Sequence, residues 1–427
     1  MANSVMSYSP RFWAGMMVVA ALAAKDAGGG GWRGVVDAML EEPDDTAYVA
    51  ERIVSGETLA AIRERRPRHV AFVMLPEEID EQTLRGMKRM MCSVDDDPFD
   101  DAMWGVVTGP TAADAMRVAT SRAPGEITSV LATTGVDKDL VPGPVTVISD
   151  ANPPGEWWRK AAGGEVERHS TTGDTSHVFA EAWRESDPDL LLTSSHASER
   201  NLEMPFSRGN VVACREGLGT AANAQLIDYS TGQAIDGAAE SVRLSPLAAP
   251  RREKVWLAAG NCLIANHKPG CDMVMSLLGF GRVNQFVGYI KTTWYGEIGW
   301  TTWRYFGEYG LALNESWYAA NLQLERKLTD GTSKGERDMM GLAWDFDGTV
   351  FYGNPRRRTV IPGRERRAAS KPGDPPQLII FPDSRKGRRL VSAPEGFEVF
   401  VADDFALVTA WPDLDEGWRE TLRFSAD

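Results

Sequence analysis

Two apolar runs in the sequence each end on a residue that could take part in nucleophilic chemistry. The run LLLTSSH ends on His196, and the run KVWLAAGNC ends on Cys262. A thiol becomes a strong nucleophile when a nearby imidazole takes its proton. The alternative is an ordinary buried cysteine and an unrelated loop histidine. Because ligands of open α/β sheets bind beyond the carboxyl ends of the strands, we predict that Cys262 and His196 form a thiol–imidazole pair at one sheet edge.

The residues around both candidates are small, and we expect them to let a substrate backbone come close to the sulfur. They are Ser194, Ser195 and Ala197 beside the histidine, and Ala258, Ala259 and Gly260 before the cysteine.

A carboxylate follows another predicted strand, residues 145–149, at Asp150. It could orient His196, or it could line a pocket that favours a basic side chain. The third interpretation is a solvated carboxylate at a strand end.

A second cysteine, Cys271, lies close to the first, with His267 between them. The spacing C-x4-H-x3-C is compatible with a zinc site, although no fourth ligand is obvious. His267 could instead serve as the base for either cysteine, so Cys271 is a secondary nucleophile candidate.

The run DFDGTV, beginning at Asp345, matches the Asp-x-Asp-Gly-Thr signature of haloacid-dehalogenase-like phosphohydrolases. In that chemistry Asp345 would be the nucleophile, Asp347 an acid or base, and Mg²⁺ would neutralise the phosphoryl oxygens. That motif normally opens its domain, whereas this one stands near the end of the chain. A tight turn around Gly348 is the alternative.

The elements that must position these residues follow an alternating pattern of short apolar strands and helices, which is typical of an open, mostly parallel α/β sheet. We predict strands at residues 16–21, 68–75, 104–108, 126–132, 145–149, 190–195, 254–262 and 285–290, and helices at 32–41, 58–66, 81–91, 112–122, 156–162, 177–184, 271–278 and 314–328. The pattern closes with the runs 341–344 and 350–352.

Changes in composition suggest the domain organisation. We expect an N-terminal α/β subdomain over residues 1–142, a second α/β subdomain over 143–353 that carries the candidate site, and a linker followed by a β-rich domain over 354–427. Residues 197–250 are rich in Gly, Ser and Asn and indicate an insertion between the two active strands.

The composition narrows the function classes. The formal net charge of −14 argues against general binding of nucleic acid or of an anionic membrane, because both reward clustered positive charge. Four cysteines in 427 residues do not form the dense framework of a small disulfide-rich protein, so we expect free thiols. We expect a peptide or protein partner and no cofactor; the oligomeric state stays open.

The N-terminal run FWAGMMVVAALAA, residues 12–24, has two interpretations. It resembles the apolar region of a signal peptide, and it also fits a buried first strand. We expect the strand and a cytoplasmic protein, and export through this run stays open.

The segments LLLTSSHASERN and VWLAAGNCLIANH resemble the two active-site strands of the gingipain-like cysteine peptidases, which are relatives of the caspases in clan CD, family C25. In that family one strand ends in Gly-His-Gly-Ser, and a later strand ends in a small residue and the catalytic cysteine. Here Ser195 and Ala197 replace the two glycines, while Ser198 matches. Residues 58–122, 285–300 and 352–355 are also similar to family segments.

The resemblance implies a caspase-like, three-layer α/β/α fold and thiol endopeptidase activity without a cofactor. Cys262 would attack the scissile carbonyl, and His196 would handle the proton. The backbone N–H groups of Ala197 and Cys262 would bind the oxyanion, and Trp294 would wall the pocket for the residue before the cleaved bond. The replaced glycines leave an alternative open, in which the chain is an inactive relative that serves as a binding or scaffold protein.

Overall fold

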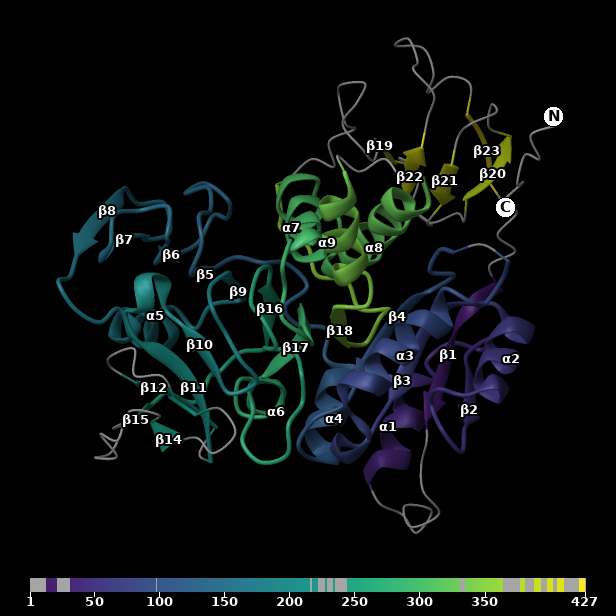
Figure 1. Cartoon of the computed structure of the whole chain (residues 1–427), viewed down its shortest axis with the longest axis horizontal. Helices are drawn as coiled ribbons and strands as arrows, with labels where there is room; N and C mark the ends of the chain where they lie inside the picture. Colours follow the sequence, from purple (N-terminus) through teal and green to yellow (C-terminus); the bar gives the residue numbers. More distant parts are fainter. Residues whose placement is uncertain are drawn as a thin grey trace.

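The structure is a computed structural model that describes residues 13–20, 31–96, 98–215, 217–221, 227–228, 233–234, 244–330, 335–363, 377–380, 388–392, 398–401, 405–410 and 422–426. Twelve strands in this part of the chain form one sheet in the order β2-β1-β3-β4-β18-β17-β16-β9-β5-β6-β7-β8 (Figure 1). Its strands are β1 (Trp13–Ala20), β2 (Thr46–Val49), β3 (Pro67–Val73), β4 (Met103–Val107), β5 (Val130–Ala132), β6 (Val145–Val147), β7 (Glu156–Lys160), β8 (Val166–Ser170), β9 (Leu190–Thr193), β16 (Lys254–Ala258), β17 (Val283–Tyr289) and β18 (Thr349–Gly353).

Apart from the antiparallel hairpin β7–β8 at one edge, the sheet is made of two groups of parallel strands that run in opposite directions. Strands β2, β1, β3, β4 and β18 are parallel, and so are β17, β16, β9, β5 and β6. Between the groups, β17 pairs with β18 in antiparallel register. The prediction of a mostly parallel α/β sheet is confirmed, and the two predicted subdomains contribute to one continuous sheet. The carboxyl ends of the strands in one group therefore lie on the opposite side of the sheet from those in the other group.

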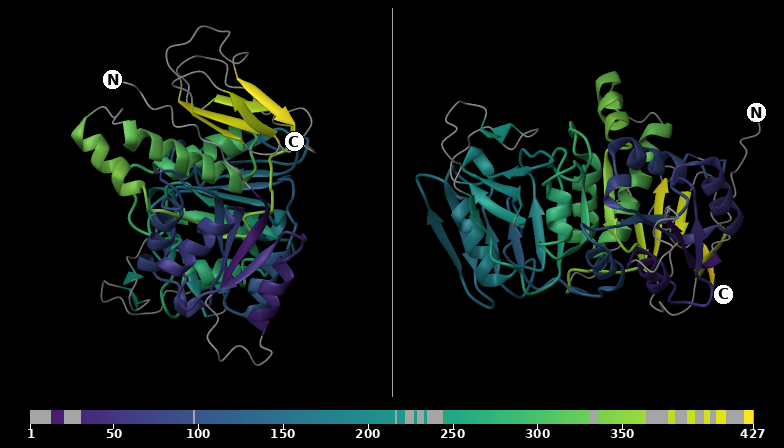
Figure 2. Two further views of the ribbon diagram at one scale, coloured as in Figure 1. Left: turned by 90° about the vertical axis from the view of Figure 1, so that its right-hand side faces the viewer. Right: turned by 90° about the horizontal axis from the view of Figure 1, so that it is seen from below.

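Helices cover both faces of the sheet (Figure 2). The connection through α1 leads from β1 to its neighbour β2 on one side. The connection through α2 leads back from β2, past β1, to β3 on the other side. Right-handed crossovers therefore place α1 and α2 on opposite faces. The α-helices of the described residues are α1 (Gly31–Met39), α2 (Gly56–Arg65), α3 (Glu81–Met91), α4 (Ala112–Thr120), α5 (Ser176–Ser186), α6 (Met273–Leu278), α7 (Glu297–Trp303), α8 (Leu313–Asp330) and α9 (Glu336–Asp345).

Local sequence explains why these elements form. The central strands are continuous apolar runs with both faces buried, as in other parallel sheets, and β16 and β17 are buried at every position. Side chains cap four of the helices that follow strands: Ser55 caps α2, Asp80 caps α3, Thr111 caps α4, and Asp272 caps α6. Each accepts a hydrogen bond from an otherwise unsatisfied N–H in the first helical turn.

The N-terminal run forms the strand that one of its two interpretations predicts. β1 lies between β2 and β3 and is parallel to both, and Met16 to Ala20 are fully buried. The strand predicted at residues 16–21 is confirmed over residues 16–20, and β1 begins earlier, at Trp13. Residues 12 and 21–24 of the export-signal interpretation lie outside the described part. None of the described helices has the length and apolar character needed to cross a bilayer.

Two predicted elements are wrong. Residues 156–160 form the antiparallel strand β7 rather than a helix, because their backbone groups pair with strands on both sides, and Trp158 is buried. β7 pairs with β6 on one side and forms a hairpin with β8, the edge strand, on the other. The run 341–344 belongs to helix α9 rather than to a strand.

The predicted insertion is a small structure of its own. Strands β10 (Asn201–Glu203), β11 (Asn210–Cys214), β12 (Gly217–Ala221) and β15 (Leu244–Pro246) form an antiparallel sheet beside α5 and α6. A two-stranded sheet, β13 (Ile227–Asp228) and β14 (Gln233–Ala234), is also described in this region.

The C-terminal part of the chain is rich in strands where the structure describes it. β19 (Gln377–Ile380), β22 (Phe405–Ala410) and β21 (Glu398–Val401) form one sheet, while β20 (Arg388–Ser392) and β23 (Arg423–Ala426) form another. Most of the predicted linker, residues 364–376, lies outside the described residues.

Candidate active site

The two candidate reactive residues lie in one pocket. Strands β9 and β16 are parallel neighbours, and Thr193 at the end of β9 pairs with Ala258 at the end of β16. The chain beyond each strand brings His196 and Cys262 to the lining of a cavity of ≈ 500 Å³. His196 is exposed and Cys262 is half-buried. The predicted position of this pair, at the carboxyl edge of parallel strands, is the position that the structure shows.

The thiol of Cys262 contacts the backbone of the next pocket loop. The Thr293 N–H donates to the Cys262 sulfur at 3.3 Å, and the thiol donates to the Thr293 carbonyl oxygen at 3.8 Å. Within the described part of the chain, the His196 imidazole has no hydrogen-bond partner, so both ring nitrogens are available.

The two predicted oxyanion donors are also available. Ala197 pairs with Leu202 in an isolated antiparallel bridge, in which Glu203 N–H donates to the His196 carbonyl and Ser198 N–H donates to the Asn201 carbonyl. This pattern leaves the Ala197 N–H unused. Among the described residues, neither this N–H nor that of Cys262 donates to a protein acceptor.

Asn261, which sequence reasoning did not single out, ties the two active loops together. It is completely buried; its side-chain N–H donates to the Ser195 carbonyl at 2.8 Å, and its side-chain oxygen accepts from the Thr193 hydroxyl at 2.6 Å. The Trp256 indole N–H donates to the same hydroxyl at 2.9 Å. Asn261 therefore fixes the loop before His196 against the residue that precedes Cys262.

The small residues around the site fall into two groups, one buried in close packing and one lining the pocket. Ala258 and Ala259 are fully buried. A Cβ on Gly299 would lie 2.1 Å from the Ala259 carbonyl oxygen, and a Cβ on Gly260 would lie 2.5 Å from the Ser194 hydroxyl. Ala258 and Ala259 are therefore small because α7 and the β9 loop pack against the β16 loop. Ser194, Ser195 and Gly260 line the pocket, and their role in admitting a substrate backbone stays a prediction.

Aromatic side chains form a wall of the pocket. Trp294, the predicted wall residue, lines the cavity and is 50% exposed. Three more exposed aromatic residues line the same cavity: Phe206, Tyr295 and Trp300. The Arg337 guanidinium of α9 stacks over the Trp294 ring at 5.8 Å. Such a wall offers apolar contact to a bound chain while its edges stay in water.

Two acidic residues also line the pocket. Asp150 follows β6 and is exposed, and Glu203 at the end of β10 is half-buried. Asp150 accepts from the Ser149 hydroxyl at 3.5 Å. No hydrogen bond joins it to His196 within the described part. Glu203, which sequence reasoning missed, comes from the predicted insertion, and its place in the pocket depends on the bridge between Ala197 and Leu202.

The phosphohydrolase motif has a structural use instead. Asp345 is the last residue of α9 and is completely buried. Asp347 is held by three cations: Arg85 at 3.0 Å, Arg89 at 2.6 Å and Lys291 at 2.6 Å. A buried nucleophile cannot reach a phosphate ester, and the structure therefore does not support a phosphohydrolase centred on Asp345.

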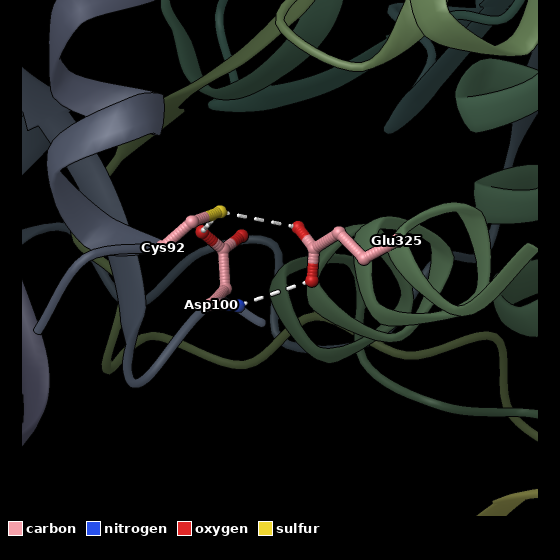
Figure 3. A group of neighbouring side chains, drawn as sticks. All are labelled: Cys92, Asp100 and Glu325. Atoms are coloured by element: carbon pink, nitrogen blue, oxygen red, sulfur yellow. Dashed lines mark hydrogen bonds between the residues drawn. The ribbon is translucent and has the colours of Figure 1, made fainter. Parts of the chain in front are cut away.

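The zinc interpretation also finds no support in the geometry. The His267 ring nitrogen pairs with Asp272, and neither His267 nor Cys271 lines the pocket. Among the described residues, the set close enough to hold a metal ion is Cys92, Asp100 and Glu325 (Figure 3).

A lysine already supplies the positive charge at that set. Lys88 donates to Asp100 at 2.7 Å and to Glu325, and all three side chains are buried. The Cys92 thiol donates to Asp100 at 3.3 Å and to Glu325 at 3.5 Å. Burial and the two carboxylates raise the pKa of the Cys92 thiol far above its usual range. This cluster joins α3 to α8 through a buried ion network. Because the thiolate is disfavoured there, we expect the Cys92 thiol to react slowly.

Comparison with known proteins yields a match in shape alone. No family model matches the sequence, and no curated protein matches it. One solved structure described as a protease matches with a TM-score of 0.44 and 12% identity, over 94% of this chain and 92% of that chain. The complex of the pro- and mature domains of RgpB, a gingipain from Porphyromonas gingivalis, matches with a TM-score of 0.45 and 8% identity, over 92% of this chain and 93% of that chain. At these values the match carries no argument about function.

Proposed function

We propose that this chain is a cysteine endopeptidase with Cys262 as nucleophile and His196 as general base and acid. One observation carries the proposal: a single pocket collects the Cys262 thiol, the His196 imidazole and the Cys262 backbone N–H, and neither the imidazole nor this N–H has a hydrogen-bond partner among the described residues. The Ala197 N–H, which is also unused within this part of the chain, directly follows His196. A thiol, an imidazole and N–H donors are the three parts that acyl transfer through a thiolate requires.

The proposed reaction begins with the thiolate. His196 takes the thiol proton, and the Cys262 sulfur then forms a bond to the carbonyl carbon of the scissile peptide. The oxyanion that develops accepts hydrogen bonds from the N–H groups of Ala197 and Cys262, each typically worth about 3 kcal/mol in the transition state. The imidazolium returns its proton to the leaving amine as the C–N bond breaks. Water, deprotonated by the same imidazole, then hydrolyses the thioester.

The substrate preference we propose is a basic side chain before the cleaved bond. Asp150 and Glu203 line the pocket, and Trp294 and Trp300 supply apolar contact for the stem of a lysine or arginine. Among the described residues, no lysine or arginine lines this pocket. A cationic side chain would therefore gain charge-assisted hydrogen bonds there, whereas an acidic one would be repelled.

Profiling of a peptide library tests both parts of the proposal. We expect the wild type to cleave after Lys or Arg, and Asp150→Asn to lower kcat/KM for these peptides roughly tenfold, since a hydrogen bond to a charged group contributes about 1.5–3 kcal/mol. Peptides with an uncharged residue at that position should lose little. Asp44→Asn, on an exposed turn remote from the pocket, is the matched control.

Two results would count against the proposal. If Asp150→Asn affected basic and neutral peptides equally, the specificity assignment would be wrong. If the wild type and Cys262→Ala were indistinguishable on every peptide, the chain would be the inactive binding or scaffold protein of the alternative interpretation.

A further inference from the structure

Asp345, the first residue of the run DFDGTV, makes buried hydrogen bonds inside the protein. One carboxylate oxygen accepts from the Glu297 backbone N–H at 2.6 Å and from the Tyr289 hydroxyl at 3.2 Å. The other carboxylate oxygen is buried and has no partner among the described residues. Because a buried carboxylate is costly, its retention calls for a structural or functional reason.

One of the groups bound by Asp345 belongs to residues 293–300, the segment called the pocket wall from here on. Glu297 is the first residue of α7, and the loop 293–296 immediately before it contributes Thr293, Trp294, Tyr295 and Gly296 to the pocket. Trp300, on α7 itself, also lines the pocket. The bond to the Glu297 N–H therefore anchors the wall at the point where loop becomes helix.

A second contact braces the same wall from the sheet. The Tyr289 hydroxyl on β17 donates to Asp345 and accepts from the Gly299 N–H of α7 at 3.1 Å. Close packing supplements it, because a Cβ on Gly341 of α9 would lie 1.9 Å from the Tyr295 ring. The wall is thus held between β17 and α9, and Asp345 joins the two.

The charged groups around Asp345 do not neutralise it. Glu297 of α7 pairs with Lys327 of α8, and Lys291 and the α3 arginines pair with Asp347. Burial raises the pKa of Asp345 to about 6, although the N–H groups of α7 and the Tyr289 hydroxyl act in the opposite direction. At neutral pH the carboxylate is therefore charged, and its hydrogen bonds to α7 and Tyr289 are charge-assisted and strong.

We propose that Asp345 is a positioning residue for peptide binding, which holds the pocket wall 293–300 in place beside Cys262. This inference rests on the proposed peptidase function. The wall is linked to the thiol through the Thr293 N–H, and it carries the aromatic surface that meets the substrate. Loss of Asp345 should therefore weaken substrate binding more than the chemical step.

Steady-state kinetics of Asp345→Ala and Asp345→Asn on the best library peptide test this assignment. Asp345→Ala should raise KM at least about tenfold and change kcat by less than about threefold, since binding contacts are lost while the reacting groups remain. Asp345→Asn keeps a hydrogen-bond acceptor and should raise KM by a smaller factor. Glu336→Gln, at the exposed start of the same helix, is the control and should match the wild type.

Hydrogen exchange supplies a readout that needs no activity. Exchange of the backbone amides in residues 293–303 should be at least about tenfold faster in Asp345→Ala, while amides of β9 and β16 keep the wild-type rate. If the alanine variant does not fold, the same comparison is made with Asp345→Asn. A wild-type exchange rate in 293–303, an equal increase throughout the protein, or an unchanged KM would overturn the inference. If the wild type cleaves no peptide, the proposed function fails, and the exchange data still decide the role of Asp345.

Discussion

Replacing Cys262 by alanine should lower kcat/KM by a factor on the order of 10⁴ or more, the size of effect seen when a catalytic nucleophile is removed. Alanine keeps the backbone N–H and nearly the shape of the pocket but cannot form the thioester. His196→Ala should cause a loss of similar size, because the thiol would then lack its base. The double variant should be little worse than either single one, since the two residues act as a unit.

The rival nucleophile supplies the matched control. Cys271 is also half-buried, yet it does not line the pocket, and the chain beside it is held by the Arg200 side chain, which donates to the Cys271 carbonyl oxygen at 2.7 Å. Cys271→Ser should therefore keep the wild-type kcat/KM. Activity that survived Cys262→Ala and disappeared in Cys271→Ser would show that the wrong cysteine has been assigned.

The second large effect concerns stability. Lys88→Met should lower the free energy of unfolding by about 3–5 kcal/mol, because it leaves the carboxylates of Asp100 and Glu325 buried without a cation. Burial already raises the pKa of Glu325 to about 7 even though Lys88 favours the charged form. Urea unfolding at pH 8, where both carboxylates are ionised in the unfolded chain, measures the loss.

A triple variant separates charge from packing at the same position. Lys88→Met combined with Asp100→Asn and Glu325→Gln removes every formal charge and keeps an acceptor for the Asp100 backbone N–H, which donates to Glu325 at 3.0 Å. It should be more stable than Lys88→Met alone, since a neutral buried cluster avoids the desolvation cost of unpaired charges. If the free energy of unfolding of Lys88→Met lay within about 1 kcal/mol of the wild-type value, which is the range of an exposed ion pair, the network would not be buried as described.

Sequence reasoning located the candidate pair because local patterns report the ends of buried strands. The runs before His196 and Cys262 are apolar at consecutive positions, and such runs form the central strands of parallel sheets. Their adjacency in the sheet then brings the two ends together. Asn261 and Glu203 give no comparable local signal, because each acquires its role from contacts with a different part of the chain.

The wrong interpretations of residues 156–160 and of Asp345 also arise because contacts between distant parts of the chain are not visible in a local pattern. The run at residues 156–160 contains good helix-forming residues, but tertiary pairing with β6 and β8 makes it a strand. The motif at Asp345 has the residues of a phosphohydrolase signature, whereas its chemistry depends on whether the carboxylate is exposed. A short motif specifies residue types, and the fold decides which of them meet solvent.

The most direct test of the central claim is the rate at which each cysteine reacts with a small thiol alkylator, measured by peptide mapping of the native protein. We predict that Cys262, beside an available imidazole and a backbone N–H, reacts far faster than Cys92, Cys214 and Cys271, and that His196→Ala slows Cys262 selectively. Cys92 should react slowest, because burial and its carboxylate partners raise the pKa of its thiol and keep it protonated. Labelling of Cys262 no faster than the other cysteines, or at the same rate in His196→Ala, would contradict the account.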